Sequence, residues 1–141
     1  MIELTIYGTP APQGSKRHVG NGILIESSRK VTPWREAIVS EVLRQGMEGL
    51  RMPGPVVVRL TFFLERPRGH TTPKGVRRAS APAYPLRRPD LDKLVRSSLD
   101  GLTQSGIVTD DAVVTTIHAA KRYADARPAG AAVTIHAEEY P

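Results

Sequence analysis

The stretch that decides the fold runs from Arg88 to Asp111 and reads RPDLDKLVRSSLDGLTQSGIVTDD. It holds all but one of the aspartates in the chain. After Asp90, apolar residues recur at intervals of three and four, which predicts an amphipathic helix over residues 89–103. A run with the composition of a strand follows over residues 111–123. We therefore expect carboxylates from a helix and from a strand to converge. The apolar residues of the helix are Leu91, Leu94, Val95, Leu99 and Leu102.

These acidic residues allow two interpretations. Ionised carboxylates brought together repel one another and are costly to desolvate unless a cation holds them. Oxygen-rich sites of this kind suit Mg²⁺, with Mn²⁺ as a substitute. In the structural alternative, Asp90 caps the helix, Asp92 complements the helix dipole and pairs with Arg96, and Asp110-Asp111 belong to a turn. Spacing alone leaves both open, because Asp-x-Asp is a weak motif.

Charge is divided unevenly along the 141 residues. Residues 1–89 carry 15 Lys/Arg and 6 Glu, a net charge of +9. Residues 90–141 carry 5 Lys/Arg and 8 Asp/Glu, a net charge of −3. A basic body around an acidic focus suits a nuclease, since cations attract phosphates and carboxylates hold a metal. A basic surface that is merely solvated is the alternative.

Residues 66–88 form the most distinctive segment outside the acidic stretch. These 23 residues hold seven Lys/Arg, four Pro and no acid. The segment has neither helical nor strand periodicity, and a loop of this length is usually functional or disordered. We predict a mobile phosphate-binding arm. The candidate DNA contacts in the whole chain are Lys16, Arg17, Arg66, Arg68, Lys74, Arg77, Arg78, Arg87, Arg88 and Lys121.

The remaining pattern predicts one α+β domain over residues 1–141. Thr32-Pro33 is typical of a helix start, with threonine at the N-cap, and Trp34 is the expected core anchor. We expect a sheet of four or five strands with two helices packed on one face. The predicted strands are 2–7, 56–65, 111–123 and 131–137, with a short candidate at 22–26, and the predicted helices are 32–46 and 89–103.

Several features are missing from the sequence. The chain has no cysteine, so disulfides and thiolate metal sites are excluded and a reducing cytoplasm is the expected location. No run of 18 apolar residues exists, so we expect no membrane span. The segment from Gly8 to Gly14 does not fit a phosphate-binding P-loop, because its spacing is one residue too long and Pro10 and Pro12 remove backbone donors. We expect no organic cofactor.

The motif Arg88-Pro-Asp-Leu-Asp-Lys-Leu-Val-Arg, followed by Leu99-Asp-Gly-Leu and Asp110-Asp-Ala-Val-Val, resembles the RusA-type Holliday junction resolvases. These are small, dimeric, Mg²⁺-dependent endonucleases of bacteria and their phages. The match covers most of residues 87–123, and Tyr7-Gly-Thr-Pro-Ala-Pro-Gln-Gly-Ser-Lys-Arg is similar to the family's N-terminus. The resemblance implies a RusA-like fold, a homodimer, and branched double-stranded DNA as the substrate in recombination and repair.

By this resemblance, Asp90, Asp92 and Asp111 are the metal ligands and catalytic carboxylates. The family often carries a functional lysine where this chain has Arg96, which keeps the charge but cannot titrate as a lysine does. We expect Arg96 or Lys93 to stabilise developing negative charge on the attacked phosphate.

The strand predicted after Asp110 gives two further expectations. Neighbouring residues of a strand point to opposite faces, so Asp111 faces the helix and Asp110 does not. A fully extended strand would separate Asp111 from Lys121 by about 33 Å. Lys121 would therefore serve elsewhere on the strand or across a dimer.

Two other functions fit the same composition. One is a non-catalytic nucleic-acid-binding protein whose carboxylates are structural. The other is a metal-dependent nuclease that acts on flaps or single strands.

Overall fold

The computed structural model describes residues 1–14, 16–18, 24–26 and 29–140, and for residues 16–18 and 24–26 it describes the backbone alone. The side chains of Lys16 and Arg17, two of the predicted DNA contacts, therefore lie outside what is described.

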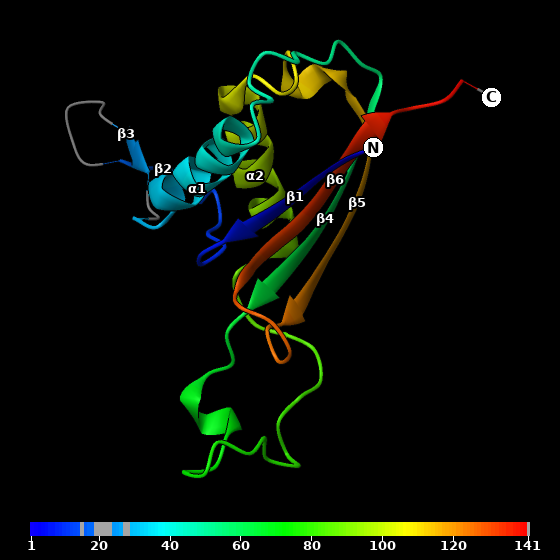
Figure 1. Cartoon of the computed structure of the whole chain (residues 1–141). Coiled ribbons are helices and arrows are strands. Elements are labelled where there is room, and N and C mark those ends of the chain that lie inside the picture. The colour runs from blue at the N-terminus through cyan, green and yellow to red at the C-terminus, as the bar shows by residue number, and fades with distance from the viewer. Residues whose placement is uncertain (15, 19–23, 27–28, 141) are drawn as a thin grey trace.

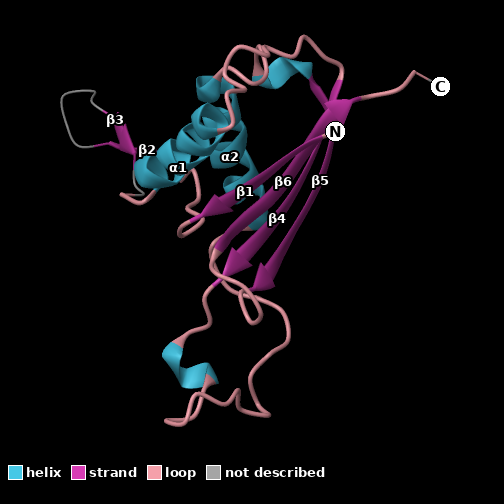
Figure 2. Cartoon of the chain, viewed as in Figure 1, coloured by secondary structure: helices cyan, strands magenta, loops and turns pink. Residues whose placement is uncertain are grey.

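One four-stranded mixed sheet organises the chain (Figure 1). Its order is β1-β6-β4-β5, with β4 parallel to β5 and antiparallel to β6, and with β1 antiparallel to β6. Helices α1 and α2 lie on one face of the sheet, and a separate pair is formed by β2 and β3 (Figure 2). This confirms the predicted α+β class. The elements are β1 (Ile2–Tyr7), β2 (Lys16–His18), β3 (Leu24–Glu26), α1 (Val31–Arg44), β4 (Val56–Leu64), α2 (Leu91–Ser105), β5 (Val114–Tyr123) and β6 (Gly130–Ala137).

The core lies between this sheet and the two helices. Alternate residues of β4 and β6 point to the helices because side chains of a strand alternate between faces. Trp34 of α1 is 2% exposed, and its indole Nε1 donates a hydrogen bond to Ser98 Oγ of α2 at 3.1 Å. The prediction that Trp34 is a core anchor is confirmed. The main buried side chains are Leu4, Ile6, Trp34, Ile38, Val42, Val58, Leu60, Phe62, Leu94, Leu102 and Ile135.

The helix ends differ slightly from the prediction. Helix α1 begins at Val31 with Lys30 at its N-cap, so the expectation of a Thr32 N-cap was wrong. The helix tolerates Pro33 in its first turn because the first four backbone N–H groups have no intrahelical acceptor. Helix α2 ends at Ser105, two residues later than predicted, where Gly106 takes the left-handed conformation (φ +82°) that favours glycine.

A glycine at the start of β6 gives a test of the sheet packing. Gly130 has a φ of +151°, and a β-carbon there would overlap the carbonyl oxygen of Ile6 on β1. We expect Gly130→Ala to lower the free energy of unfolding by about 1–3 kcal/mol through backbone strain, with a packing cost of about the same size. Urea unfolding measures this. Gly49→Ala is the matched control, since its β-carbon meets nothing within 4 Å. Equal stability of both variants would contradict the described β1–β6 contact.

Candidate active site

Asp90 and Asp92 lie at the N-terminal end of α2 with their carboxylates accessible. Asp90 occupies the N-cap position with extended backbone (φ −71°, ψ 138°), but its side chain makes no capping hydrogen bond. Its carboxylate lies 3.4 Å from Lys93 Nζ and is half exposed. Asp92 is exposed and has no ion-pair partner within the described residues, Arg96 included. Asp90 therefore does not cap the helix through its side chain and Asp92 does not pair with Arg96, although Asp92 does lie in the first turn of α2, where the structural alternative places it.

Lys121, near the end of β5, fixes the chain just before this helix start. Its Nζ donates hydrogen bonds to the carbonyl oxygens of Arg87 at 2.8 Å and Pro89 at 2.9 Å. Lys121 therefore holds the backbone of the residue that directly precedes Asp90. The ammonium group contributes positive charge to the acidic end of α2.

Asp111 lies at the other end of the same helix. It opens the short 3-10 turn η2 (Asp111–Val113), and its Oδ1 accepts a hydrogen bond from Thr103 Oγ1 at 2.5 Å. Asp110 is exposed. The prediction that Asp111 rather than Asp110 faces the helix is confirmed, but the predicted reason was wrong. Strand β5 begins only at Val114, so a turn orients the two carboxylates.

Asp100 joins Asp111 at this end of α2. Burial raises the pKa of the Asp100 carboxyl, and the nearby Asp111 carboxylate raises it further, whereas Arg35 acts in the opposite direction. Arg35 Nη1 of α1 lies 3.8 Å from Asp100 Oδ2. Sequence reasoning did not select Asp100 as a site residue. Its spacing of three from Thr103 places both on neighbouring positions of the helix surface, which was the available signal.

One chain does not bring the three predicted metal ligands together. Asp92 and Thr103 are 11 positions apart, or about 16 Å along the helix axis, and Asp111 contacts Thr103. Ligands of a single Mg²⁺ each lie about 2.1 Å from it, so their oxygens lie within roughly 4 Å of one another. The described part of one chain contains no group of three His, Cys, Asp or Glu that could hold a metal.

The expectation of convergence within one chain was therefore wrong, and the parallel pairing of β4 and β5 explains why. This pairing makes β5 run from the C-terminal end of α2, beside Asp111, to its N-terminal end, beside Pro89. Asp111 at the start of β5 is thereby kept away from Asp90 and Asp92.

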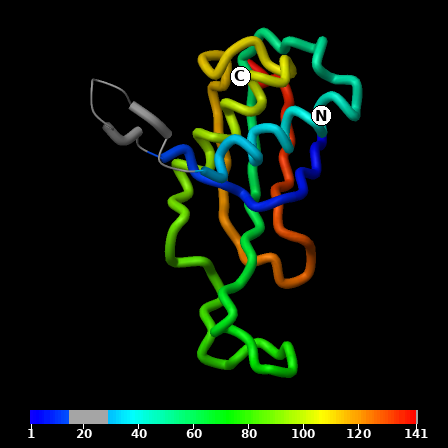
Figure 3. The backbone as a smooth tube through the Cα atoms, turned by 90° about the vertical axis from the view of Figure 1, so that its left-hand side faces the viewer, coloured from blue at the N-terminus to red at the C-terminus, as the bar shows by residue number. Residues whose placement is uncertain are grey.

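Residues 66–88 extend as an arm beyond the ends of β4 and β5 (Figure 3). The arm is not structureless, since it contains the 3-10 turn η1 (Arg68–His70) and a backbone bridge between Thr71 and Arg77. Six of its seven cations are exposed, although Arg77 Nη1 also lies 3.6 Å from Asp125 Oδ2. They are Arg68, Lys74, Arg77, Arg78, Arg87 and Arg88.

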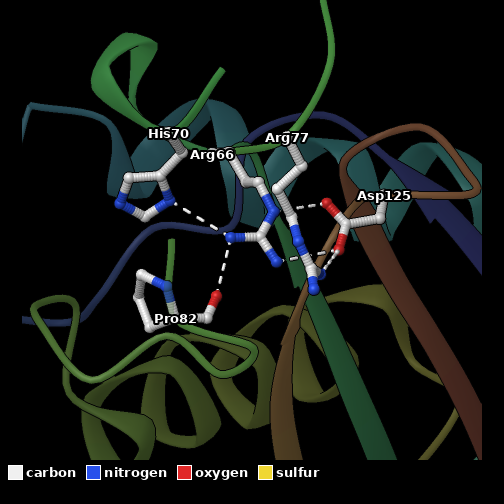
Figure 4. Close-up of polar contacts among 5 residues, drawn as sticks. All are labelled: Arg66, His70, Arg77, Pro82 and Asp125. Carbon is white, nitrogen blue, oxygen red and sulfur yellow. Dashed lines mark hydrogen bonds and ion pairs between the residues drawn. The ribbon is translucent and has the colours of Figure 1, made fainter. Parts of the chain in front are cut away.

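Arg66 is the exception, because its guanidinium group holds the base of the arm together (Figure 4). It bonds both carboxylate oxygens of Asp125, at 2.6 and 2.9 Å, and the carbonyl oxygen of Pro82 at 2.7 Å. Its Nη1 also lies 3.2 Å from His70 Nδ1. These bonds from Arg66 lower the pKa of the Asp125 carboxyl. With 7% of its side chain exposed, Arg66 supports the arm rather than presenting a free cation.

The site thus consists of carboxylates at a helix start with a basic arm beside them, on an α+β core. A scan against protein-family profiles matches Endodeoxyribonuclease RusA over residues 7–136. The chain therefore belongs to the RusA family of endodeoxyribonucleases. A search of curated proteins found no match. Among the residues that the structure describes, no helix is long and apolar enough to cross a membrane.

Proposed function

We propose that this protein is a Mg²⁺-dependent endodeoxyribonuclease that cuts Holliday junctions or related branched DNA in recombination and repair, in the cytoplasm of a bacterium or of a phage host. Membership of the RusA family supports the reaction class. The observation that carries the proposal is the pair of accessible carboxylates at the start of α2, where Asp90 makes no side-chain capping bond and Asp92 has no ion-pair partner among the described residues.

The acidic residues of both ends of α2 fit a divalent metal. Carboxylate oxygens are the ligands that Mg²⁺ and Mn²⁺ prefer, and the exposed carboxylates of Asp90 and Asp92 are accessible for that role, with Lys93 beside Asp90. Asp111 would complete the set, and Asp100 stands beside it. When bound, the metal would lower the pKa of a water molecule and neutralise charge on the attacked phosphate.

A homodimer would bring these ligands together, although α2 keeps them apart within one chain. Two copies whose α2 helices pack antiparallel across a twofold axis would place Asp92 of one copy opposite Thr103 and Asp111 of the other. The flank of α2 next to Asp92 supplies an apolar surface for such packing, since Leu91, Val95 and Leu99 remain partly exposed. Ile117 on the neighbouring strand β5 is 42% exposed. A twofold dimer would then carry two equivalent sites for two strands of a junction.

Cations around the acidic ends would act on the phosphate. Lys93 lies beside Asp90, and Arg96 is exposed on the same helix surface as Asp92 and Asp100. We assign to them the stabilisation of negative charge that develops on the attacked phosphate. Lys121 holds the carbonyl groups that precede Asp90 and so positions that carboxylate.

The arm would supply affinity rather than chemistry. We expect replacement of Arg77 and Arg78 by alanine to weaken binding of branched and linear DNA alike. The slope of log K against log salt should fall by roughly 0.9 for each lost phosphate contact. Filter binding between low and moderate salt measures the slope. Arg44→Ala is the control, since Arg44 is exposed on α1 and paired with Glu41. An unchanged slope in the double variant would remove these two arginines from the DNA surface.

A panel of DNA substrates with and without Mg²⁺ tests the function. The proposal predicts symmetric cutting of a four-way junction that requires Mg²⁺ or Mn²⁺ and stops in EDTA. Junction binding without cutting in any metal would identify a non-catalytic binding protein. Preferred cutting of flaps or single strands would identify the other nuclease class.

A further inference from the structure

A hollow of about 680 Å³ lies between the arm and the N-terminal end of α2. The ends of β4 and β5 line it with Leu64 and Tyr123, and the arm lines it with His70 and Pro82. A second hollow, lined by Asp90 and Lys93, shares four lining residues with the first: Thr9, Pro10, Arg88 and Pro89. The first hollow is therefore adjacent to the acidic helix start in space as well as in sequence.

Polar contacts hold the walls of this hollow in place. Arg66 Nη1 joins the two arm walls, since it contacts both His70 Nδ1 and the carbonyl oxygen of Pro82 (Figure 4). Asp125 anchors Arg66 to the turn after β5. On the opposite side, Lys121 fixes the carbonyl groups of Arg87 and Pro89. Binding sites that are formed before the ligand arrives lose less free energy in ordering.

The lining combines rings and apolar groups with nearby cations and one acidic residue, Glu65. The Arg66 guanidinium carbon lies over the Tyr123 ring, 4.1 Å from its centroid. The His70 and Tyr123 rings make an edge-to-face contact, with their centroids 5.5 Å apart. Pro67, Pro82, Pro85 and Leu86 add apolar surface. The exposed Arg87 and Arg88 lie on the side toward Asp90. Such a lining suits a flat heteroaromatic group that carries a phosphate.

We propose that this hollow receives one unpaired nucleobase of the DNA strand that is to be cut, with its phosphate directed to Arg88 and Lys93. The inference rests on the proposed function and adds a substrate subsite to it. Aromatic side chains bind bases of any sequence by stacking, and a base enters a pocket only after it leaves the duplex. Bases at a branch point lose less pairing and stacking than bases within a duplex, so the subsite would favour branched DNA.

A fluorescent base scan tests the subsite without relying on cleavage. The full-length Asp92→Asn protein is bound to four-way junctions that carry a single 2-aminopurine at successive positions around the branch point. We expect the fluorescence to change strongly at one position per cut strand and not in a linear duplex. If no position responds in a saturated complex, the subsite is wrong while the proposed function stands. If the unmodified protein cuts no branched DNA, the proposed function fails instead.

Variants of Tyr123 test whether the change in 2-aminopurine fluorescence comes from a base bound in the hollow. In the same Asp92→Asn background, Tyr123→Leu should lose the position-specific signal and weaken junction binding by about 5- to 150-fold, the range for one base–aromatic stack. Tyr123→Phe keeps the ring and should keep both. Tyr140→Leu is the control and should change neither, because Tyr140 is 97% exposed, lies outside the arm and does not line the hollow.

An abasic nucleotide at the responding position completes the test. If the base lies against Tyr123, removing the base and removing the ring should not weaken binding additively, since each deletes the same contact. Strictly additive losses, or an unchanged 2-aminopurine signal in Tyr123→Leu, would overturn the assignment.

Discussion

Asp92→Asn is expected to reduce the rate of junction cleavage by at least ~100-fold and to leave junction affinity unchanged. The rate falls because an amide is a poor substitute for a carboxylate as a Mg²⁺ ligand. Affinity persists because contacts from Lys and Arg to phosphates dominate binding. Asp92 is exposed and forms no ion pair with any residue that the structure describes, so the free energy of unfolding should change by no more than about 0.5 kcal/mol.

Single-turnover cleavage with Mg²⁺, together with junction binding in EDTA, separates these effects. Glu36→Gln is the matched control, since Glu36 is an exposed acid on α1 outside the proposed site. It should cut at the rate of the unmodified protein. A normal rate for Asp92→Asn would remove this residue from the site and return it to a merely structural role at the start of α2.

Asp111→Asn should abolish cleavage at any practical concentration of Mg²⁺, whereas Asp110→Asn should leave an enzyme that higher Mg²⁺ or Mn²⁺ rescues. The physical reason is orientation, because η2 turns Asp111 toward Thr103 and leaves Asp110 exposed. The two substitutions change the same charge one residue apart, so each serves as the control for the other.

The readout is the cleavage rate as a function of Mg²⁺ and Mn²⁺ concentration for both variants. A shifted but complete titration curve is expected for Asp110→Asn, and no curve for Asp111→Asn. If Asp110→Asn is inactive and Asp111→Asn cuts normally, the orientation of these two residues in η2 does not reflect their function.

Local pattern predicted the elements well, because periodicity reports which side chains are buried. The stripe of Leu94 and Leu102 gave helix α2 within two residues at each end, and the alternation around Leu60 gave the central strand β4. Trp34 was placed in the core for the same reason. Errors appeared where a backbone turn rather than burial decides the conformation, as at the start of α1 and in η2.

The way the strands and helices pack together could not be predicted from the local sequence pattern. Nothing in the residues around Asp111 encodes that β5 pairs parallel with β4, and this pairing alone places Asp111 at the far end of α2. The partners of Arg66 were equally hidden, since Asp125 lies 59 residues away in sequence. Composition correctly marked the arm as basic but did not separate a buried guanidinium from the exposed ones.

The most direct test of a site shared between two chains is a defined heterodimer. One subunit carries Asp92→Asn and the other Asp111→Asn, with different affinity tags so that only mixed dimers are purified. In a shared site, one of the two sites then combines intact Asp90 and Asp92 from one chain with intact Asp111 from the other. A heterodimer of Asp90→Asn with Asp92→Asn is the control, because both of its sites lack a ligand under either arrangement.

We predict that the Asp92→Asn/Asp111→Asn heterodimer nicks one strand of a four-way junction at up to half the total rate of the unmodified protein, while both mutant homodimers and the control heterodimer are inactive. An inactive Asp92→Asn/Asp111→Asn heterodimer that still binds the junction would contradict the shared site.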